Sequence, residues 1–270
     1  MANLGLKERY DFQQWIIKDL KEKNGYSQRD AAQYNPRLAM DEELLWDFLM
    51  ETQEETMDYL LKKLSKETII TLVNKEIVKG GFLFALKEGV FIENRQLRLL
   101  YRKPATSFNE KAVQQYKANR LSVIEEVVYE EGGRIDLVIF INGLALFAIE
   151  LKFNPSGQSV QDAIKQLKGR NPNNRLFRFE QGVLASFAVD TMEIYMTTQL
   201  KGQETYFLPF NMGKGEGIDM GSGNPHNPNG VDTEYLWLDV LTKDSILQLI
   251  ESFIFFELDK NYAKKRTLIF

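Results

Sequence analysis

The sequence contains no cysteine and only one histidine, His226, among its 270 residues. The absence of cysteine excludes disulfides, thiol catalysis and any zinc site built on thiolates. A single histidine excludes every metal site that needs several imidazoles. The side chains left for chemistry are carboxylates, lysines and hydroxyls, and these favour oxygen-preferring metals such as Mg²⁺.

Long apolar runs and nucleotide-binding loops are also missing. No stretch of about 18 apolar residues exists, so the sequence predicts no contact with a membrane interior. The opening residues MANLGLKERYDF lack a long apolar core and a small-residue cleavage site, and we expect an uncleaved, cytoplasmic protein. No GxxxxGK[ST] loop is present, so these residues are not expected to hydrolyse ATP by that route.

The charges that are present are segregated along the chain. The formal net charge of −4 disfavours nucleic-acid binding only if the two signs are evenly mixed. Residues 41–58 carry eight acids and no base, whereas residues 163–179 carry five bases and no acid. Two solvated faces would give this pattern, and so would a basic path for DNA beside a remote acidic surface.

Hydrophobic periodicity predicts a mixed α/β protein. Helices are predicted over residues 6–22, 41–64, 66–79, 109–118, 159–168 and 243–262. Extended segments are predicted over residues 82–86, 90–92, 97–101, 121–129, 184–189 and 193–198, and a glycine-rich loop over 211–230. Between them, residues 134–153 form two apolar runs around Asn142-Gly143, which predicts a hairpin in the centre of a sheet covered on both faces.

Charged residues interrupt this hairpin at one end. Asp136 opens the first run, and Glu150 and Lys152 close the second, where they share one face of the strand. The Leu151 carbonyl lies between them. Because buried charges are costly unless they are paired or metal-bound, two carboxylates and a carbonyl here predict a Mg²⁺ site, with Lys152 as a catalytic group. Charges that simply meet water at strand ends are the alternative.

The strand register tests this hypothesis. A simple two-residue turn at Asn142-Gly143 places Asp136 opposite Ile149, so that Glu150 projects from the other face. A three-residue turn with a bulge at Gly143, or an equivalent shift by one residue, places Asp136 on the face of Glu150 and Lys152. The metal site therefore requires the shift.

The segment Asp136-LVIFINGLALFAI-Glu150-Leu151-Lys152 resembles the PD-(D/E)xK nucleases, and more narrowly the N-terminal domain of the R subunit of type I restriction-modification enzymes. Gly157-QSVQDAIKQ-Leu167 resembles the helix that follows in that family, and the similarity extends over nearly the whole chain. The resemblance implies a central mixed β-sheet flanked by helices, with an N-terminal helical insertion at about 36–80. It assigns 1–200 to the nuclease domain and 201–270 to a glycine-rich loop and helical extension leading to an ATP-driven motor.

The function implied is Mg²⁺-dependent cleavage of double-stranded DNA, with ATP used only by the full-length subunit and with modification and specificity subunits as partners. The resemblance also implies a DNA-positioning role for Gln166, and an additional upstream acid for which Glu8 is the candidate, with Gln13 behind it. A tyrosine that accompanies this glutamine in the family is absent, because Leu167 and Arg170 stand at its two alternative positions. We therefore expect Lys168 and Arg170 to contact phosphates instead.

Lys165, Lys168 and Arg170 are predicted to line the DNA path, with residues 41–58 facing away from it. Two other functions stay open on the residues alone. The acidic net charge and the absent tyrosine fit a non-catalytic DNA-binding or assembly domain with the same fold. An enzyme acting on a small phosphate ester would have a closed pocket in place of an open groove.

Overall fold

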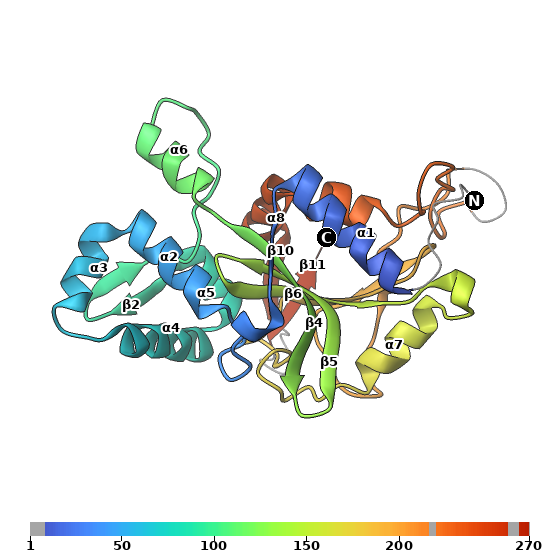
Figure 1. The fold of residues 1–270 in the computed structure, drawn as a ribbon, viewed down its shortest axis with the longest axis horizontal. Helices are drawn as coiled ribbons and strands as arrows, with labels where there is room; N and C mark the ends of the chain where they lie inside the picture. Colours follow the sequence, from blue (N-terminus) through green and yellow to red (C-terminus); the bar gives the residue numbers. More distant parts are fainter. Residues whose placement is uncertain (1–8, 216–219, 259–264, 270) are drawn as a thin grey trace.

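The computed structural model describes residues 9–215, 220–258 and 265–269, and a seven-stranded sheet lies at its centre (Figure 1). The strand order is β1-β4-β5-β6-β7-β8-β9, with β1–β4 and β6–β7 parallel and the other neighbours antiparallel. The strands are β1 Ser27–Arg29, β4 Leu121–Glu130, β5 Gly133–Ile141, β6 Leu144–Leu151, β7 Ala185–Val189, β8 Ile194–Thr197 and β9 Leu208–Pro209. The predicted class, a mixed sheet flanked by helices, is confirmed, and the hairpin β5–β6 is central.

Helices cover both faces of the sheet. The larger apolar cluster packs α1 to α5 against one face, and the smaller cluster packs α7 against the other. The helices are α1 Arg9–Asn24, α2 Glu42–Thr52, α3 Glu54–Leu61, α4 Lys66–Gly80, α5 Phe82–Glu88, α6 Glu110–Lys117, α7 Val160–Lys168 and α8 Lys243–Gln248, with 3-10 turns at Ala31–Gln33 and Asn154–Ser156 and π-helical turns at Leu236–Val240 and Leu249–Phe253. No helix among the described residues has the length and apolar character needed to cross a bilayer.

The turn between β5 and β6 is a buried two-residue turn. Asn142 and Gly143 both have positive φ angles, 50° and 80°, as a type I′ turn requires. The Asn142 side chain accepts the Arg120 backbone N–H at 2.7 Å and donates to the Leu99 carbonyl at 2.9 Å. These contacts hold the turn against neighbouring segments, and of the two predicted alternatives the three-residue turn with its bulge at Gly143 is not the one observed.

The register shift occurs inside β6 instead. Phe140 pairs with Ala145 near the turn, but Ile139 pairs with Phe147, so Leu146 is the extra residue. Leu146 and Phe147 both belong to the larger apolar cluster, and the Leu146 carbonyl accepts the Leu184 N–H at 2.9 Å. Packing and pairing with the segment before β7 thus accommodate the bulge at this position. It produces the one-residue shift on which the metal-site hypothesis depends.

Two predicted segments near the N-terminus differ from the structure. The helix predicted over 41–64 is two helices, because Gln53 leaves helical geometry and its amide pairs with both backbone groups of Arg98, at 2.7 and 2.9 Å. The extended segment predicted over 82–86 belongs to α5, in which four apolar side chains are buried. A short apolar run does not distinguish a buried helix from a buried strand.

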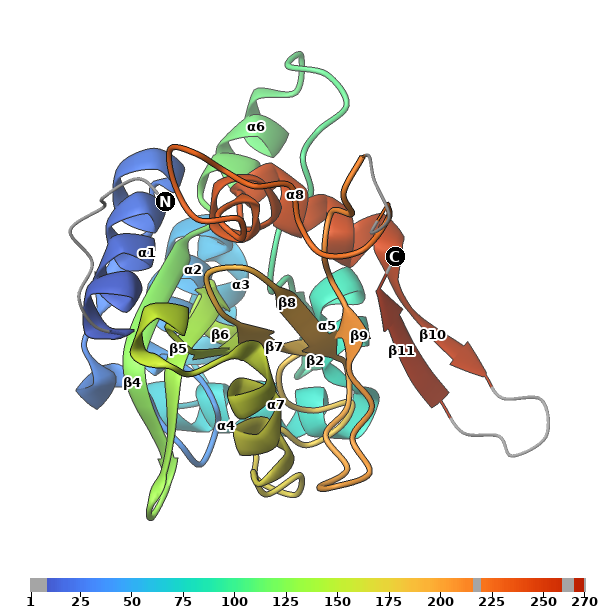
Figure 2. The ribbon, with the colours of Figure 1, turned by 90° about the vertical axis from the view of Figure 1, so that its right-hand side faces the viewer.

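Outside the main sheet, two small hairpins complete the fold. β2 (Val90–Ile92) pairs with β3 (Arg95–Leu97). The extended segment predicted at 97–101 therefore overlaps β3 only at Leu97, and the rest of it has no regular secondary structure. The helix predicted over 243–262 is also wrong after Phe253, and residues 259–262 of that prediction lie outside the described residues. It ends at the π-helical turn, after which β10 (Ile254–Leu258) pairs with β11 (Lys265–Ile269), away from the main sheet (Figure 2).

Candidate active site

Asp136 and Glu150 meet on one face of the sheet. Leu137 pairs with Ile149, and continuing this register by one residue places Asp136 opposite Glu150. Glu150 pairs with Ala188 of β7, which belongs to the apolar cluster on the α7 side. The two acids therefore lie under α7, with Asp136 4% exposed and Glu150 fully buried. The arrangement that would have separated them, with one acid on each face, is not observed.

The Asp136 carboxylate accepts a backbone N–H at the end of β6, where regular strand pairing would supply a backbone carbonyl as the acceptor. Its Oδ2 accepts the backbone N–H of Leu151 at 2.7 Å. In an extended strand the N–H and C=O of one residue point toward the same neighbouring strand. The Leu151 carbonyl is therefore directed to the same side as the N–H that binds Asp136, which leaves three oxygen-bearing groups around the end of β5–β6.

Lys152 lies beside the acids and is anchored by α7. Its Nζ donates to Gln166 Oε1 at 2.8 Å and lies 3.4 Å from Glu150 Oε1. The Lys152 side chain is only 7% exposed, so this ammonium group is held by two polar partners in a mostly buried setting. Gln166 holds the lysine in this structure, and its expected role in positioning DNA stays a prediction.

Arg170 reaches the same acid from just beyond the end of α7. Its Nη2 lies 2.9 Å from Glu150 Oε2, and its guanidinium carbon lies 5.7 Å from the centre of the Tyr129 ring. The Arg170 side chain is only 11% exposed, and its predicted contact with DNA phosphates stays a prediction. Each Glu150 oxygen thus faces one cationic group, Lys152 or Arg170.

Burial and charge raise the pKa of Glu150 to about 7. The largest cause is loss of hydration, followed by repulsion from Asp136, while Arg170 and Lys152 act in the opposite direction. A carboxyl group that gives up its proton with difficulty is expected where two acids share a buried site.

The raised pKa predicts that Glu150 destabilises the metal-free fold as pH rises. As pH rises, the native state keeps the Glu150 proton longer than the unfolded chain does. Glu150 therefore destabilises the fold least below about pH 4.5, the ordinary pKa of glutamate, and the free energy of unfolding falls as the pH rises from there through about 7. In a chelating buffer, the free energy of unfolding of the wild type should fall by about 2–3 kcal/mol more than that of Glu150→Gln between about pH 5 and about pH 8. Urea unfolding at both pH values measures this difference. Parallel pH profiles for the two chains would contradict the shift.

An open cavity of about 580 Å³ gives solvent access to this cluster. Its polar lining comes from both sides of the site: Arg134, Asp136, Lys152, Gln158, Gln166 and Arg170. Gln158 has no role in the sequence predictions, because an exposed loop glutamine carries no periodic signal. An adjoining cavity of about 460 Å³ shares Gln166 and Arg170 and adds Lys165, whereas Lys168 lines neither.

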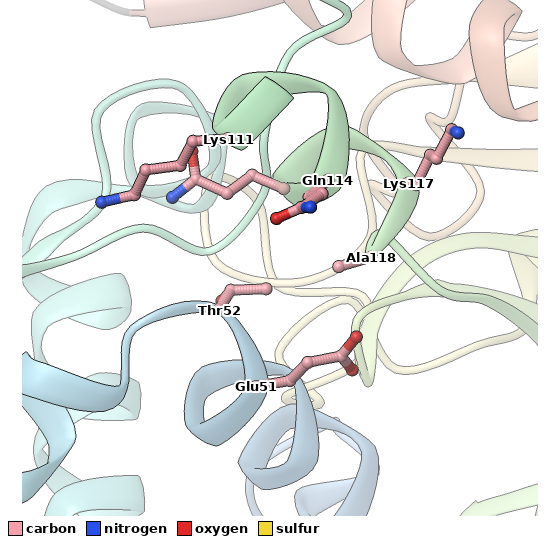
Figure 3. Close-up of a pocket in the computed structure, with 7 residues that line it drawn as sticks. Glu51, Thr52, Lys111, Gln114, Lys117 and Ala118 are labelled. Atoms are coloured by element: carbon pink, nitrogen blue, oxygen red, sulfur yellow. The ribbon is translucent and has the colours of Figure 1, made fainter. Parts of the chain in front are cut away.

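A separate cavity of about 520 Å³ lies between α2 and α6. Figure 3 shows Glu51 and Thr52 on one side and Lys111 and Gln114 on the other. The Glu51 carboxylate is already paired with Arg120. No residue of β5, β6 or α7 lines this cavity, so it is distinct from the acidic pair.

The remaining predicted residues lie elsewhere. Glu8 falls outside the described residues. Gln13 is buried on α1, where its amide donates to Glu125 Oε2 at 2.9 Å. The acid-rich helices α2 and α3 lie at the opposite end of the molecule from α7, as expected for residues 41–58 (Figure 1).

The oxygen donors at the site are suited to Mg²⁺. The described part of the chain contains no group of three or more His, Cys, Asp or Glu side chains arranged to hold a metal, and the donors at this site are two acids and the Leu151 carbonyl. Mg²⁺ commonly binds through one or two carboxylates and keeps several water ligands. The donor set therefore fits this ion.

A comparison with curated proteins found no match. A family model does match, that of the type I restriction enzyme R protein N terminus, over residues 6–205 of the 270. The matched range contains the acidic pair, Lys152, all of α7 and six of the seven strands of the main sheet. The fold is consistent with a nuclease-like α/β domain. The chain therefore belongs to the family of type I restriction enzyme R protein N-terminal domains, and this membership supports a nuclease role on DNA within a multisubunit enzyme.

Proposed function

We propose that this chain is an Mg²⁺-dependent endonuclease domain that hydrolyses phosphodiester bonds of double-stranded DNA. The observation that carries the proposal is the meeting of Asp136 and Glu150 on one face of β5–β6, beside an anchored Lys152. A purely structural pair of strand-end acids would not need the register shift at Leu146, nor a buried lysine beside them.

Asp136, Glu150 and the Leu151 carbonyl would hold the Mg²⁺ ion. When bound there, Mg²⁺ would polarise the scissile phosphate and lower the pKa of an attacking water. The hydrogen bond from the Leu151 N–H orients Asp136, which lines the cavity. Register and hydrogen bonding thus prepare the acids before any ligand enters.

Lys152 would orient the attacking water or stabilise the negative charge that develops on the phosphate. Gln166 holds its ammonium group at 2.8 Å, which limits the number of rotamers that the long side chain can adopt. Gln158 and Arg134 line the same cavity and are placed to contact the DNA backbone. Gln158 and Gln166 are exposed, and this open, polar cavity suits a polymer better than a small phosphate ester.

The proposed setting is a type I restriction-modification complex with modification and specificity subunits. DNA cleavage would then depend on ATP only through a motor carried elsewhere in the R subunit. A non-catalytic DNA-binding or assembly domain with this fold is the competing function, and it predicts that the acidic pair has no effect on cleavage.

Metal removal tests the proposal. The R subunit that carries this chain and the motor, assembled with the modification and specificity subunits, should cut plasmid DNA in Mg²⁺ with ATP, and the cutting should stop when the protein-bound metal is removed. Because ATP hydrolysis also needs Mg²⁺, cleavage and ATP hydrolysis should be measured together. We expect Asp136→Asn to abolish cleavage while ATP hydrolysis by the complex continues. Equal cleavage by this variant would favour the non-catalytic function.

A further inference from the structure

Arg170 occupies a position that a metal ion would also need. Its Nη2 contacts Glu150 Oε2 at 2.9 Å, while Lys152 lies 3.4 Å from the other oxygen. An ion bound by Glu150 must therefore share an oxygen with a cationic side chain or displace it. Lys152 is anchored by a 2.8 Å hydrogen bond to Gln166, whereas the other partner of Arg170 is Tyr129, which it meets through the ring face and the hydroxyl group. Because Arg170 lies just beyond the end of α7, it is the group better able to leave.

With both acids ionised, the formal charges of the cluster balance without a metal. Asp136 and Glu150 contribute two negative charges, and Lys152 and Arg170 contribute two positive charges. A divalent ion added to this mostly buried group would leave two excess positive charges in a poorly screened setting. Entry of an anionic phosphate would offset them, so metal and phosphate should bind together more favourably than either does alone.

Arg170 also has an unused donor. Its Nε is buried and has no hydrogen-bond partner among the described residues. Buried donors without partners are uncommon and call for an explanation. Because Arg170 lines both adjoining cavities, a phosphate in either could accept from this guanidinium, whose planar array of donors suits phosphate oxygens.

We propose that Arg170 is a displaceable counter-ion of Glu150: metal binding releases its guanidinium, which then binds a DNA phosphate. This inference rests on the proposed nuclease function and adds a coupling between its two ligands. Linkage requires the effect to be reciprocal, so DNA that draws Arg170 away from Glu150 raises the affinity of the site for metal. The site would thus be filled mainly when DNA is present.

Mn²⁺ binding provides the test, with a readout independent of cleavage. Electron paramagnetic resonance of free Mn²⁺ would give the Kd for the wild type, Arg170→Gln and Arg102→Gln, with and without a short duplex at low temperature. Arg102 is the matched control, because it forms an Arg–Glu pair with Glu251 at 3.2 Å, outside the candidate site. Without DNA, Arg170→Gln should bind Mn²⁺ about tenfold more tightly than the wild type, and the control should not change.

The DNA dependence completes the test. Duplex DNA should tighten Mn²⁺ binding to the wild type by about tenfold and to Arg170→Gln by much less. Equal wild-type affinity with and without DNA would overturn the inference even if Arg170→Gln failed to fold. Unchanged or weaker Mn²⁺ binding by folded Arg170→Gln would overturn it as well. If Mn²⁺ binding were absent, or unaffected by Asp136→Asn, the proposed function would fail too.

Discussion

Asp136→Asn is expected to reduce DNA cleavage by the assembled enzyme by about 10²–10³-fold or more. The asparagine can still accept the Leu151 N–H that Asp136 accepts at 2.7 Å, so the end of β5–β6 should stay in place. What is lost is a negative charge aimed at the metal position. Lys152→Met should cause a comparable loss of cleavage, because it removes the ammonium group. Methionine keeps most of the buried side-chain volume, so the packing around position 152 should be preserved. The rate of plasmid nicking at saturating Mg²⁺ measures both effects.

Glu131→Gln is the control for these substitutions. It also neutralises one acid near the site, but Glu131 is exposed and lines only the adjoining cavity. Its nicking rate should stay close to that of the wild type. The proposal would be contradicted by wild-type cleavage in both Asp136→Asn and Lys152→Met, provided that DNA binding and complex assembly are intact. A loss of assembly in those variants, with no loss of cleavage per assembled complex, would point to the non-catalytic function.

The central hairpin could be predicted because its signals are local. Asn142-Gly143 suits a type I′ turn, and the apolar runs on both sides require cover on two faces of the sheet. The spacing of Glu150 and Lys152 places both on one face of any strand. The sequence showed that a metal site needs a one-residue shift in register, but it did not show where the shift occurs. The bulged residue is Leu146, and its position depends on packing and on the hydrogen bond from Leu184, which is distant in sequence.

The environment of the acids could not be read from local patterns. Arg170 lies two residues beyond the end of α7, where helical periodicity no longer indicates a direction. Its contact with Glu150 depends on how the chain leaves the helix at Gly169 and on the Tyr129 ring from β4. The helix predicted for the C-terminal segment was wrong for a related reason: an apolar run rich in Phe and Ile can form a helix or a strand, and here its pairing partner is a segment that follows later in the chain.

Gly143→Ala is expected to destabilise the protein by about 3 kcal/mol or more. Gly143 has a φ angle of 80°, which is unfavourable for alanine. An added Cβ would also lie 2.3 Å from the Asp41 carbonyl oxygen and 2.7 Å from the Leu45 nitrogen. Both are backbone atoms at the start of α2, and the Asp41 N–H donates to the Gly143 carbonyl at 2.7 Å, so neither side can move without breaking that bond.

Gly132→Ala separates the two causes of this loss. Gly132 has a φ angle of 70°, but a Cβ there would meet no atom within 4 Å, so it should cost only about 1–2 kcal/mol from backbone conformation. Urea unfolding of the two variants measures the difference. Equal losses would mean that the close approach of α2 to the turn is not needed. A larger loss at Gly143 would show that the turn joining β5 and β6 is held by a helix from a distant part of the chain, while the bulge at Leu146 sets Asp136 opposite Glu150.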